Sequence, residues 1–147
     1  MKKIIKVLLI LLIIGVITGV GVYLYVFHKP ARDVAGEKPA YILKANDLLK
    51  QYSEKEADCN KMYGDKALQL SGTIADITKN GKSITIILEN AETGVNCNFE
   101  EEYCTANAAV FEKVKVGESI TIQGKCDGYD EIMGAVLTRC SVVEENK

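Results

Sequence analysis

Hydrophobic residues are concentrated at the start of this chain. Lys2, Lys3 and Lys6 precede an uncharged run of 21 residues, 7–27. At about 1.5 Å of rise per residue, a helix of that length reaches about 31 Å, close to the hydrocarbon thickness of a bilayer. The pattern predicts a transmembrane helix over 7–27. A short basic end stays on the cytoplasmic side, so we expect residues 1–6 in the cytoplasm. The expected location is the cytoplasmic (inner) membrane, with a single span and an extracytoplasmic C-terminal domain.

A cleaved signal peptide is the alternative to a retained anchor. The apolar region of a signal peptide is shorter, about 7–15 residues, and ends at small residues. Here only Gly19 and Gly21 resemble such a site, and both interpretations export the domain. Gly15 and Gly19 also form a G-x-x-x-G pair, whose spacing lets two membrane helices approach closely and permits a homodimer. The alternative is that glycine is simply common in membrane helices.

Residues 28–39 have the composition of a linker, because they hold both prolines of the chain, Pro30 and Pro39. The remaining 108 residues, 40–147, are enough for one small domain. That domain opens with apolar residues spaced three and four apart, which predict an amphipathic helix over 45–63.

The apolar period then changes to two, which predicts strands. We expect a first strand from Leu68 to Ile77, bent or bulged near Gly72 or Ala75. Asn80 and Gly81 form a hairpin signal that leads to a second strand, 82–89. A turn over 90–94 leads to a third strand, 95–99.

A short helix is predicted over 105–114, where alanines and a phenylalanine cluster. In the fourth strand, we expect Ile120 and Ile122 to face inward and Thr121 and Gln123 to face outward. A turn over 127–130 then leads to a last strand, 132–143. The fold class is therefore mainly β with an N-terminal helix. One helix between the third and fourth of five strands is typical of a five-stranded OB-fold barrel, here preceded by one transmembrane helix.

Several segments of 46–143 also carry specific sequence signatures. They are 56–57 (EA), 63–66 (YGDK), 70–74 (LSGTI), 95–99 (VNCNF), 116–128 (VGESITIQGKCDG) and 137–140 (LTRC). On these segments the chain resembles the tRNA_anti-like family of bacterial OB-fold domains, many of which are lipoproteins or membrane-anchored proteins. The resemblance implies an OB fold and supplies no catalytic residue. Cys59 and Cys104 are additions to the family pattern.

The net charge of the domain limits which partners are expected. The chain beyond Pro30 carries 14 basic and 20 acidic residues, a net charge of −6. Phosphate backbones attract basic surfaces, so nucleic acid is not the expected partner.

Five cysteines lie in the exported part, at positions 59, 97, 104, 126 and 140. An exported compartment permits disulfides, and an odd number leaves at least one thiol unpaired. The candidate bridges are Cys97–Cys104, Cys97–Cys140 and Cys126–Cys140, the last of which requires a bulge or a bend. The alternative is that several are buried, reduced thiols. The gaps do not match the C-x2–4-C spacing of zinc sites, so no metal or cofactor is expected.

Candidate ligand-binding residues lie in acidic loops. Tyr103 follows Glu100–Glu102, and Tyr129 lies between Asp127 and Asp130. Because OB-folds bind through loops and strand faces, the two tyrosines and the two aspartates are candidates for a binding lip. The alternatives are a Ca²⁺ loop, whose spacing does not match, and simple solvation.

The only histidine, His28, lies at the expected membrane boundary, and no catalytic Ser-His or Cys-His pair is present in the domain. The tail also lacks the His-x-x-x-Tyr motif of membrane-anchored haem chaperones. We therefore expect a membrane-anchored, extracytoplasmic OB-fold binding module for an unidentified protein or small molecule, and not an enzyme. The alternatives are a nucleic-acid or oligosaccharide binder and a thiol-redox or metal-handling protein of the cell envelope.

Overall fold

The computed structural model describes residues 1–27 and 36–144. It divides into two compact units, Met1–Arg32 and Asp33–Lys147, which we describe separately. Most of the linker predicted over 28–39, together with His28, lies outside the described residues.

The first unit contains one helix, α1 (Lys2–Phe27). It begins five residues before the predicted span, because lysine is a good helix former and continues the helix beyond the apolar run. The most apolar 18-residue window within Lys2–Val26 has a mean hydropathy of 2.8, so α1 is long and apolar enough to cross a membrane. The hydroxyl of Thr18 donates a hydrogen bond to the carbonyl of Ile14 at 2.8 Å, which satisfies this polar group within the helix itself.

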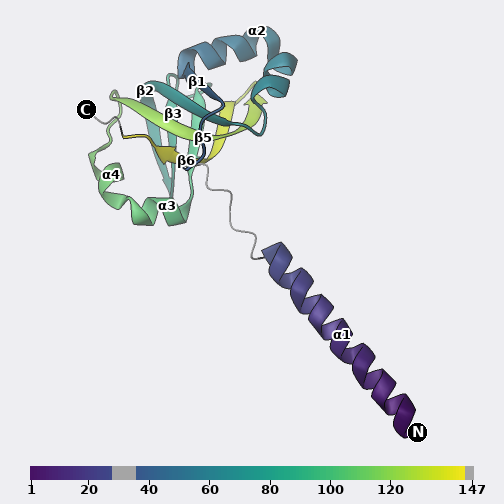
Figure 1. Ribbon diagram of the computed structural model, residues 1–147. Helices are drawn as coiled ribbons and strands as arrows, with labels where there is room; N and C mark the ends of the chain where they lie inside the picture. Colours follow the sequence, from purple (N-terminus) through teal and green to yellow (C-terminus); the bar gives the residue numbers. More distant parts are fainter. Residues whose placement is uncertain (28–35, 145–147) are drawn as a thin grey trace. The chain divides into compact units, whose positions relative to one another are not determined.

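The second unit is an OB-fold barrel with one additional strand (Figure 1). Its strands are β1 (Tyr41–Lys44), β2 (Ala67–Asn80), β3 (Ser83–Leu88), β4 (Val95–Phe99), β5 (Ser119–Asp130) and β6 (Gly134–Val142). They form a six-stranded sheet in the order β1-β2-β3-β4-β6-β5, and pairing between β2 and β5 closes the barrel. The predicted fold class is confirmed, with six strands instead of five.

The strand missed from the sequence is β1, which pairs in parallel with Leu68–Ser71 of β2. The 14-residue β2 has room for it, because β2 changes partners along its length. Its first half pairs with β5, and its second half pairs with β3 after a register shift between Ile74 and Asp76. A bulge was expected near Gly72 or Ala75, and this shift places it at Ala75. Gly81, with φ +65°, is the first residue of the two-residue turn between β2 and β3. A positive φ was expected at both Asn80 and Gly81, and only Gly81 has one.

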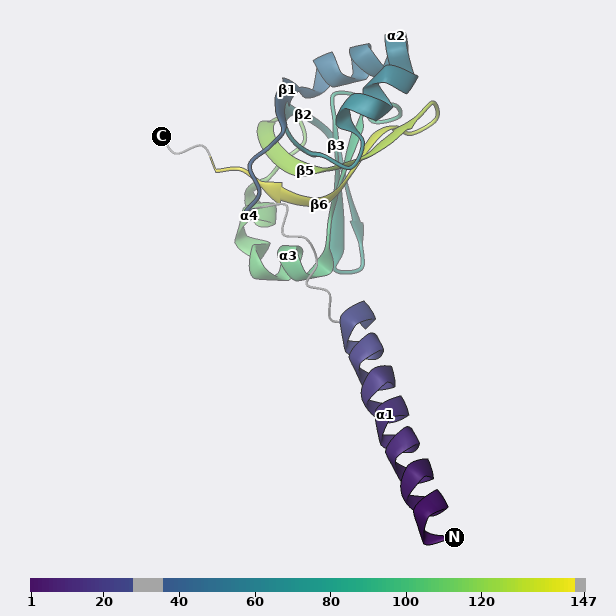
Figure 2. The ribbon, with the colours of Figure 1, turned by 45° about the vertical axis from the view of Figure 1, so that its right-hand side comes forward.

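Helix α2 (Ala45–Tyr63) has the predicted bounds. It contributes five side chains to the core, at positions 45, 48, 52, 59 and 63. Lys55 interrupts it with non-helical angles (φ −148°, ψ 62°), so that α2 consists of two helical segments joined at a kink. Figures 1 and 2 show α2 over the end of the barrel at which β5 turns into β6.

Two helices replace the single helix predicted over 105–114. They are α3 (Glu101–Ala106) and α4 (Ala108–Lys113), separated by Asn107 at φ −120° and ψ 30°. Glu101 and Glu102, expected in a loop, lie in the first turn of α3, where carboxylates interact favourably with the helix dipole. Both helices lie at the opposite end of the barrel from α2 (Figure 1).

The last hairpin differs most from the prediction. Strand β5 runs through the predicted turn and ends at Asp130, and β6 begins at Gly134. Register shifts along β5 and a left-handed Arg139 (φ 51°) change which side chains face inward. Gln123 keeps the expected orientation, opposite Gln69 and away from the core residue Ile122. It is nevertheless buried because the segment before β1 covers it, where its side chain donates a hydrogen bond to the carbonyl of Glu37.

Candidate functional site

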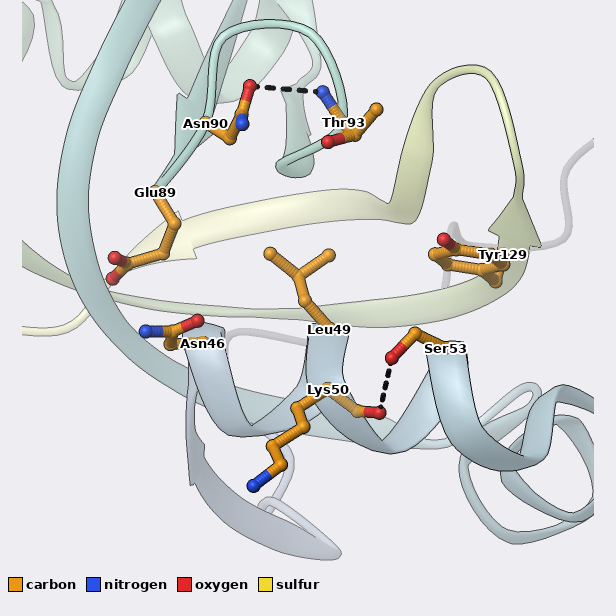
Figure 3. Close-up of a pocket in the computed structure, with 8 residues that line it drawn as sticks. All are labelled: Asn46, Leu49, Lys50, Ser53, Glu89, Asn90, Thr93 and Tyr129. Carbon is orange, nitrogen blue, oxygen red and sulfur yellow. Dashed lines mark hydrogen bonds between the residues drawn. The ribbon is translucent and has the colours of Figure 1, made fainter.

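A cleft lies between α2 and the loops at one end of the barrel (Figure 3). Its volume is about 540 Å³, within the range of small-ligand pockets. We call it the α2 cleft. It is lined by Asn46, Leu49, Lys50 and Ser53 of α2, by Glu89, Asn90 and Thr93 of the β3–β4 loop, and by Tyr129 of β5.

The helix wall of the cleft follows from the helical repeat. Its four residues have the spacing i, i+3, i+4 and i+7, so they form one stripe beside the stripe that is buried in the core. Figure 3 shows the side chain of Leu49 pointing from α2 towards the loops, whereas the side chain of Lys50 runs away from them. The helix therefore presents an apolar group between polar neighbours.

The loop wall is held in place by its own side chains. Asn90 accepts hydrogen bonds through Oδ1 from the backbone N–H groups of Glu92 (2.9 Å) and Thr93 (3.4 Å). Glu89 has a left-handed backbone (φ 70°), uncommon for a residue with a side chain. Its carboxylate accepts a hydrogen bond from the backbone N–H of Thr73 at 3.1 Å, which holds Glu89 beside β2.

Tyr129 closes one end of the cleft and is supported from behind. Its ring lies parallel to the ring of Tyr52, with centroids 5.1 Å apart and planes at 9°. Tyr52 is only 1% exposed, and its hydroxyl lies 3.3 Å from Sγ of Cys126. Burial, together with this hydrogen bond, raises the pKa of Tyr52, so its hydroxyl stays neutral. The half-buried ring of Tyr129 is thus held against a fixed aromatic surface.

The other candidate tyrosine, Tyr103, lies elsewhere. Its ring packs against Phe99 (5.9 Å between centroids) and Phe111 (6.2 Å), and its hydroxyl accepts the backbone N–H of Val142 at 2.9 Å. Phe99, which Tyr103 contacts, is the last residue of β4. Tyr129 pairs with Ala135, and Ala135 pairs with Val95, the first residue of β4. The four residue steps of β4 separate these ends by about 13 Å. The structure therefore does not bring the two tyrosines together in one lip.

The two candidate aspartates have local structural partners. Asp127 forms an ion pair with Lys125 at 3.0 Å, and Asp65 binds the same ammonium group at 3.1 Å. These hydrogen bonds raise the pKa of Lys125. Asp130 accepts hydrogen bonds from the backbone N–H groups of Ile132 (2.7 Å) and Met133 (3.1 Å), so it stabilises the hairpin turn. Within residues 1–27 and 36–144, no group of three or more His, Cys, Asp or Glu could hold a metal ion.

The expected disulfides are not present, since all five cysteines are free and buried. Cys97 and Cys140 do lie against each other, with a hydrogen bond between their side chains. Burial in an apolar core raises the pKa of Cys140 well above its usual value. The thiol of Cys104 donates to the carbonyl of Phe99 at 3.6 Å. The cysteines therefore pack as small apolar residues, the alternative considered from the sequence.

Most lining residues of the cleft were missed from the sequence. Asn46, Leu49 and Ser53 lie on the expected helix, but nothing in its periodicity shows that a loop lies opposite them. Asn90 was placed correctly in the turn over 90–94. Asparagine at the start of this segment and Gly94 at its end are residues typical of an ordered turn, so they could have indicated the loop wall.

The outward face of β3 and β4 has a different chemistry. Its side chains are those of Ser83, Thr85, Ile87, Asn96 and Asn98. The hydroxyl of Thr85 donates to Oδ1 of Asn98 at 2.8 Å. None of these five described side chains is aromatic or cationic, whereas single-stranded nucleic acids bind through stacking on aromatic rings and through positive charge.

Several solved structures are similar to this chain. A "putative nucleic acid-binding lipoprotein" from Klebsiella pneumoniae is 21% identical, with a TM-score of 0.56, and the match covers 79% of this chain and 100% of that one. One chain of the S. pombe Stn1–Ten1 complex is 11% identical (TM-score 0.40; 54% of this chain, 59% of that one). Asparaginyl-tRNA synthetase of Entamoeba histolytica is 18% identical (TM-score 0.42; 56% of this chain, 22% of that one).

No curated protein matches the chain. The model of the tRNA_anti-like family matches residues 1–142, nearly the whole length. The closed barrel, the two helices between β4 and β5, and this match lead to one conclusion: the chain is a member of the tRNA_anti-like family.

Proposed function

We propose that this protein is a tethered binding module, in which α1 anchors the chain in the membrane and the OB-fold domain holds a partner in the α2 cleft outside the cytoplasm. The single observation that carries the proposal is the construction of this cleft. Its walls come from a helix with five core side chains, a loop fixed by Asn90, and Tyr129 stacked on a buried ring. Such fixed walls limit the entropy lost when a ligand binds.

Two further observations support the anchoring part of the proposal. The helix α1 combines a high mean hydropathy with lysines at its N-terminal end only. The Klebsiella protein of the same fold is named as a lipoprotein, which agrees with membrane association. The basic end favours a cytoplasmic N-terminus by the positive-inside tendency, and therefore an exported domain.

Topology is tested by labelling introduced cysteines in intact cells with a membrane-impermeant maleimide. Ala109→Cys places a thiol on exposed α4, and the matched control Lys3→Cys places one at the basic end. We expect labelling of the first variant in intact cells and of the second only after lysis. The reverse pattern would overturn the proposed orientation.

Partner binding is tested by photocrosslinking in the same cells. A benzophenone amino acid replaces Ser53 in the cleft, and in a control protein it replaces Ala109 at the opposite end of the barrel. We expect a discrete adduct from position 53 that is absent from position 109. No adduct at position 53, or the same adduct from both positions, would contradict binding in the α2 cleft.

Binding of single-stranded nucleic acid is the second candidate function, favoured by the family and by the name of the Klebsiella relative. The outward face of β3 and β4 is neutral, and the chain beyond Pro30 has a net charge of −6. Both features disfavour the binding of nucleic acid. Fluorescence anisotropy of a labelled oligothymidine, measured with the full chain in neutral detergent, tests this second function. Binding that weakens steeply with added salt would support this second function.

A further inference from the structure

Carboxylates surround the α2 cleft. Glu89 lines it, Glu92 lies on the same loop, and Asp130 and Glu131 lie on the hairpin that carries Tyr129. Within the described part of the chain, none of these four carboxylates belongs to an ion pair. Their combined negative potential is therefore not neutralised by neighbouring side chains.

Among the described residues, two cations of this region, Lys50 and Lys125, do not form ion pairs with these carboxylates. The side chain of Lys50 lines the cleft at its base but runs away from the loops (Figure 3). Lys125 is held by Asp65 and Asp127. A ligand approaching from the loop side therefore meets a surface of net negative charge.

Apolar side chains lie within this acidic surface. Leu49 points into the cleft, and Ile132 and Met133 are 81% and 54% exposed at the tip of the β5–β6 hairpin. The tip is a fixed structure, because the side-chain amide of Asn96 donates to the carbonyl of Met133 and Asp130 stabilises the turn. Two adjacent apolar side chains held in water on an ordered turn offer an apolar contact to a partner.

We propose that the α2 cleft and the hairpin tip bind a polypeptide segment that carries positive charges and at least one large apolar side chain. The inference rests on the proposed function, because it names the class of ligand for the same cleft. Charge complementarity supports it, since lysine and arginine match the unpaired carboxylates. An apolar side chain of the segment covers Leu49 or Ile132, which removes apolar surface from water.

The acidic rim also separates this partner from other ligands. Phosphate groups of nucleic acids and anionic lipid headgroups are repelled by the carboxylates at positions 89, 92, 130 and 131. A neutral peptide gains only the apolar contact. The charge pattern therefore favours a basic, partly apolar segment over these alternatives.

The test measures peptide binding to the full chain in nanodiscs of zwitterionic phosphatidylcholine. The probes are fluorescein-labelled peptides of alternating leucine and lysine, of leucine and glutamate, and of serine and lysine, with oligothymidine as a nucleic-acid probe. Empty nanodiscs report binding to lipid alone. We expect the leucine–lysine peptide to bind at least about tenfold more tightly than each of the others, and more weakly as salt is added.

Variants locate the site. E89Q combined with E131Q removes two charges, while glutamine at position 89 keeps an oxygen that can accept the hydrogen bond of Thr73. We expect weaker binding of the leucine–lysine peptide and a smaller dependence on salt. E102Q combined with E112Q, at exposed positions of α3 and α4, also removes two charges and should leave affinity unchanged. Ile132→Ser should weaken binding as well, and Val116→Ser, which changes a residue 58% exposed, is its apolar control.

Equal binding of the leucine–glutamate peptide or of oligothymidine would overturn the inference. Equal effects of the cleft and control variants would overturn it too. If position 53 forms a specific crosslink in cells while the leucine–lysine peptide does not bind, the ligand class is wrong and the proposed function stands. If the peptide binds at the cleft but position 53 forms no adduct in cells, the proposed function is contradicted, and the surface chemistry remains as inferred.

Discussion

Gly134 lies directly against Thr93, so that a side-chain carbon added to Gly134 would be 2.6 Å from the carbonyl oxygen of Thr93. Gly134 begins β6, and Thr93 belongs to the β3–β4 loop that lines the α2 cleft. Two segments far apart in sequence thus meet backbone to backbone. This contact joins the hairpin that carries Tyr129 to the loop wall of the cleft.

Replacing Gly134 with alanine should therefore be costly. The new methyl group collides with backbone carbonyls, and the φ of +83° is itself unfavourable for alanine. We expect a loss of about 2–4 kcal/mol in the free energy of unfolding, measured in urea. Gly117→Ala is the matched control, since its φ is +91° and nothing lies within 4 Å of the added carbon. It should cost only about 1 kcal/mol, from backbone strain. Equal losses in the two variants would contradict the contact.

The two candidate tyrosines should separate into different roles. Tyr103→Ala removes ring contacts with Phe99 and Phe111 and the acceptor for Val142, and should cost about 3–5 kcal/mol of stability. Tyr129→Ala removes the stacking contact with Tyr52 and one end of the cleft. We expect Tyr129→Ala to cost less stability and to lose the crosslink from position 53. A folded Tyr103→Ala protein that lost the crosslink, beside a Tyr129→Ala protein that kept it, would reverse these roles.

The five thiols should be protected in the native protein. All are buried, and iodoacetamide requires an accessible thiolate. We expect mass spectrometry of the native full chain to show no adducts, while Ala109→Cys gains one at its exposed position. Unfolding without reductant should give five adducts. Fewer than five after unfolding would mean that some of these cysteines form disulfides.

Stability should decrease at alkaline pH. Burial raises the pKa of Cys59, Cys104, Cys126 and Cys140 above the ordinary value of 9.0. Near and above pH 9.0 the unfolded chain releases these protons while the folded chain keeps them, so the unfolded state gains stability. Each such thiol contributes a slope of up to about 1.4 kcal/mol per pH unit, which ends once the pH passes its raised folded pKa.

Urea unfolding between about pH 8 and pH 10, with reductant present, measures this slope. Cys140→Ala removes a buried thiol whose pKa is raised well above 9.0. The pH dependence of its free energy of unfolding should therefore be smaller than that of the unchanged protein, whatever the absolute stability of the variant. An unchanged slope would show that Cys140 does not contribute.

Local periodicity was sufficient to predict much of this fold. The bounds of α2, a bulge near Gly72 or Ala75 and the first hairpin follow from apolar spacing and from Asn80–Gly81. The parallel β1 was not predictable in this way, because four residues give no clear period and the partner strand lies more than 20 positions further along the chain.

The end of β5 was also missed, for a specific reason. Gly128 suggested a turn, but a φ of +131° and a register shift let β5 continue past it. The real turn is stabilised by Asp130, whose role depends on the backbone N–H groups of the two following apolar residues. The α2 cleft depends on the contact of Gly134 with the β3–β4 loop, a tertiary relationship that no local pattern contains.

The position of β1 also has a mechanical consequence. Along the chain, Tyr41–Lys44 is the first regular element of the OB-fold unit, and its pairing with Leu68–Ser71 is only four residues long. The backbone N–H of Ala40 adds one hydrogen bond to the carbonyl of Ala67. Any tension applied from the N-terminal side reaches this short strand before it reaches the closed barrel. Such a load would first break the hydrogen bond between Gln123 and the carbonyl of Glu37, which precedes β1. The β1–β2 pairing would break next, followed by α2, which follows β1 directly.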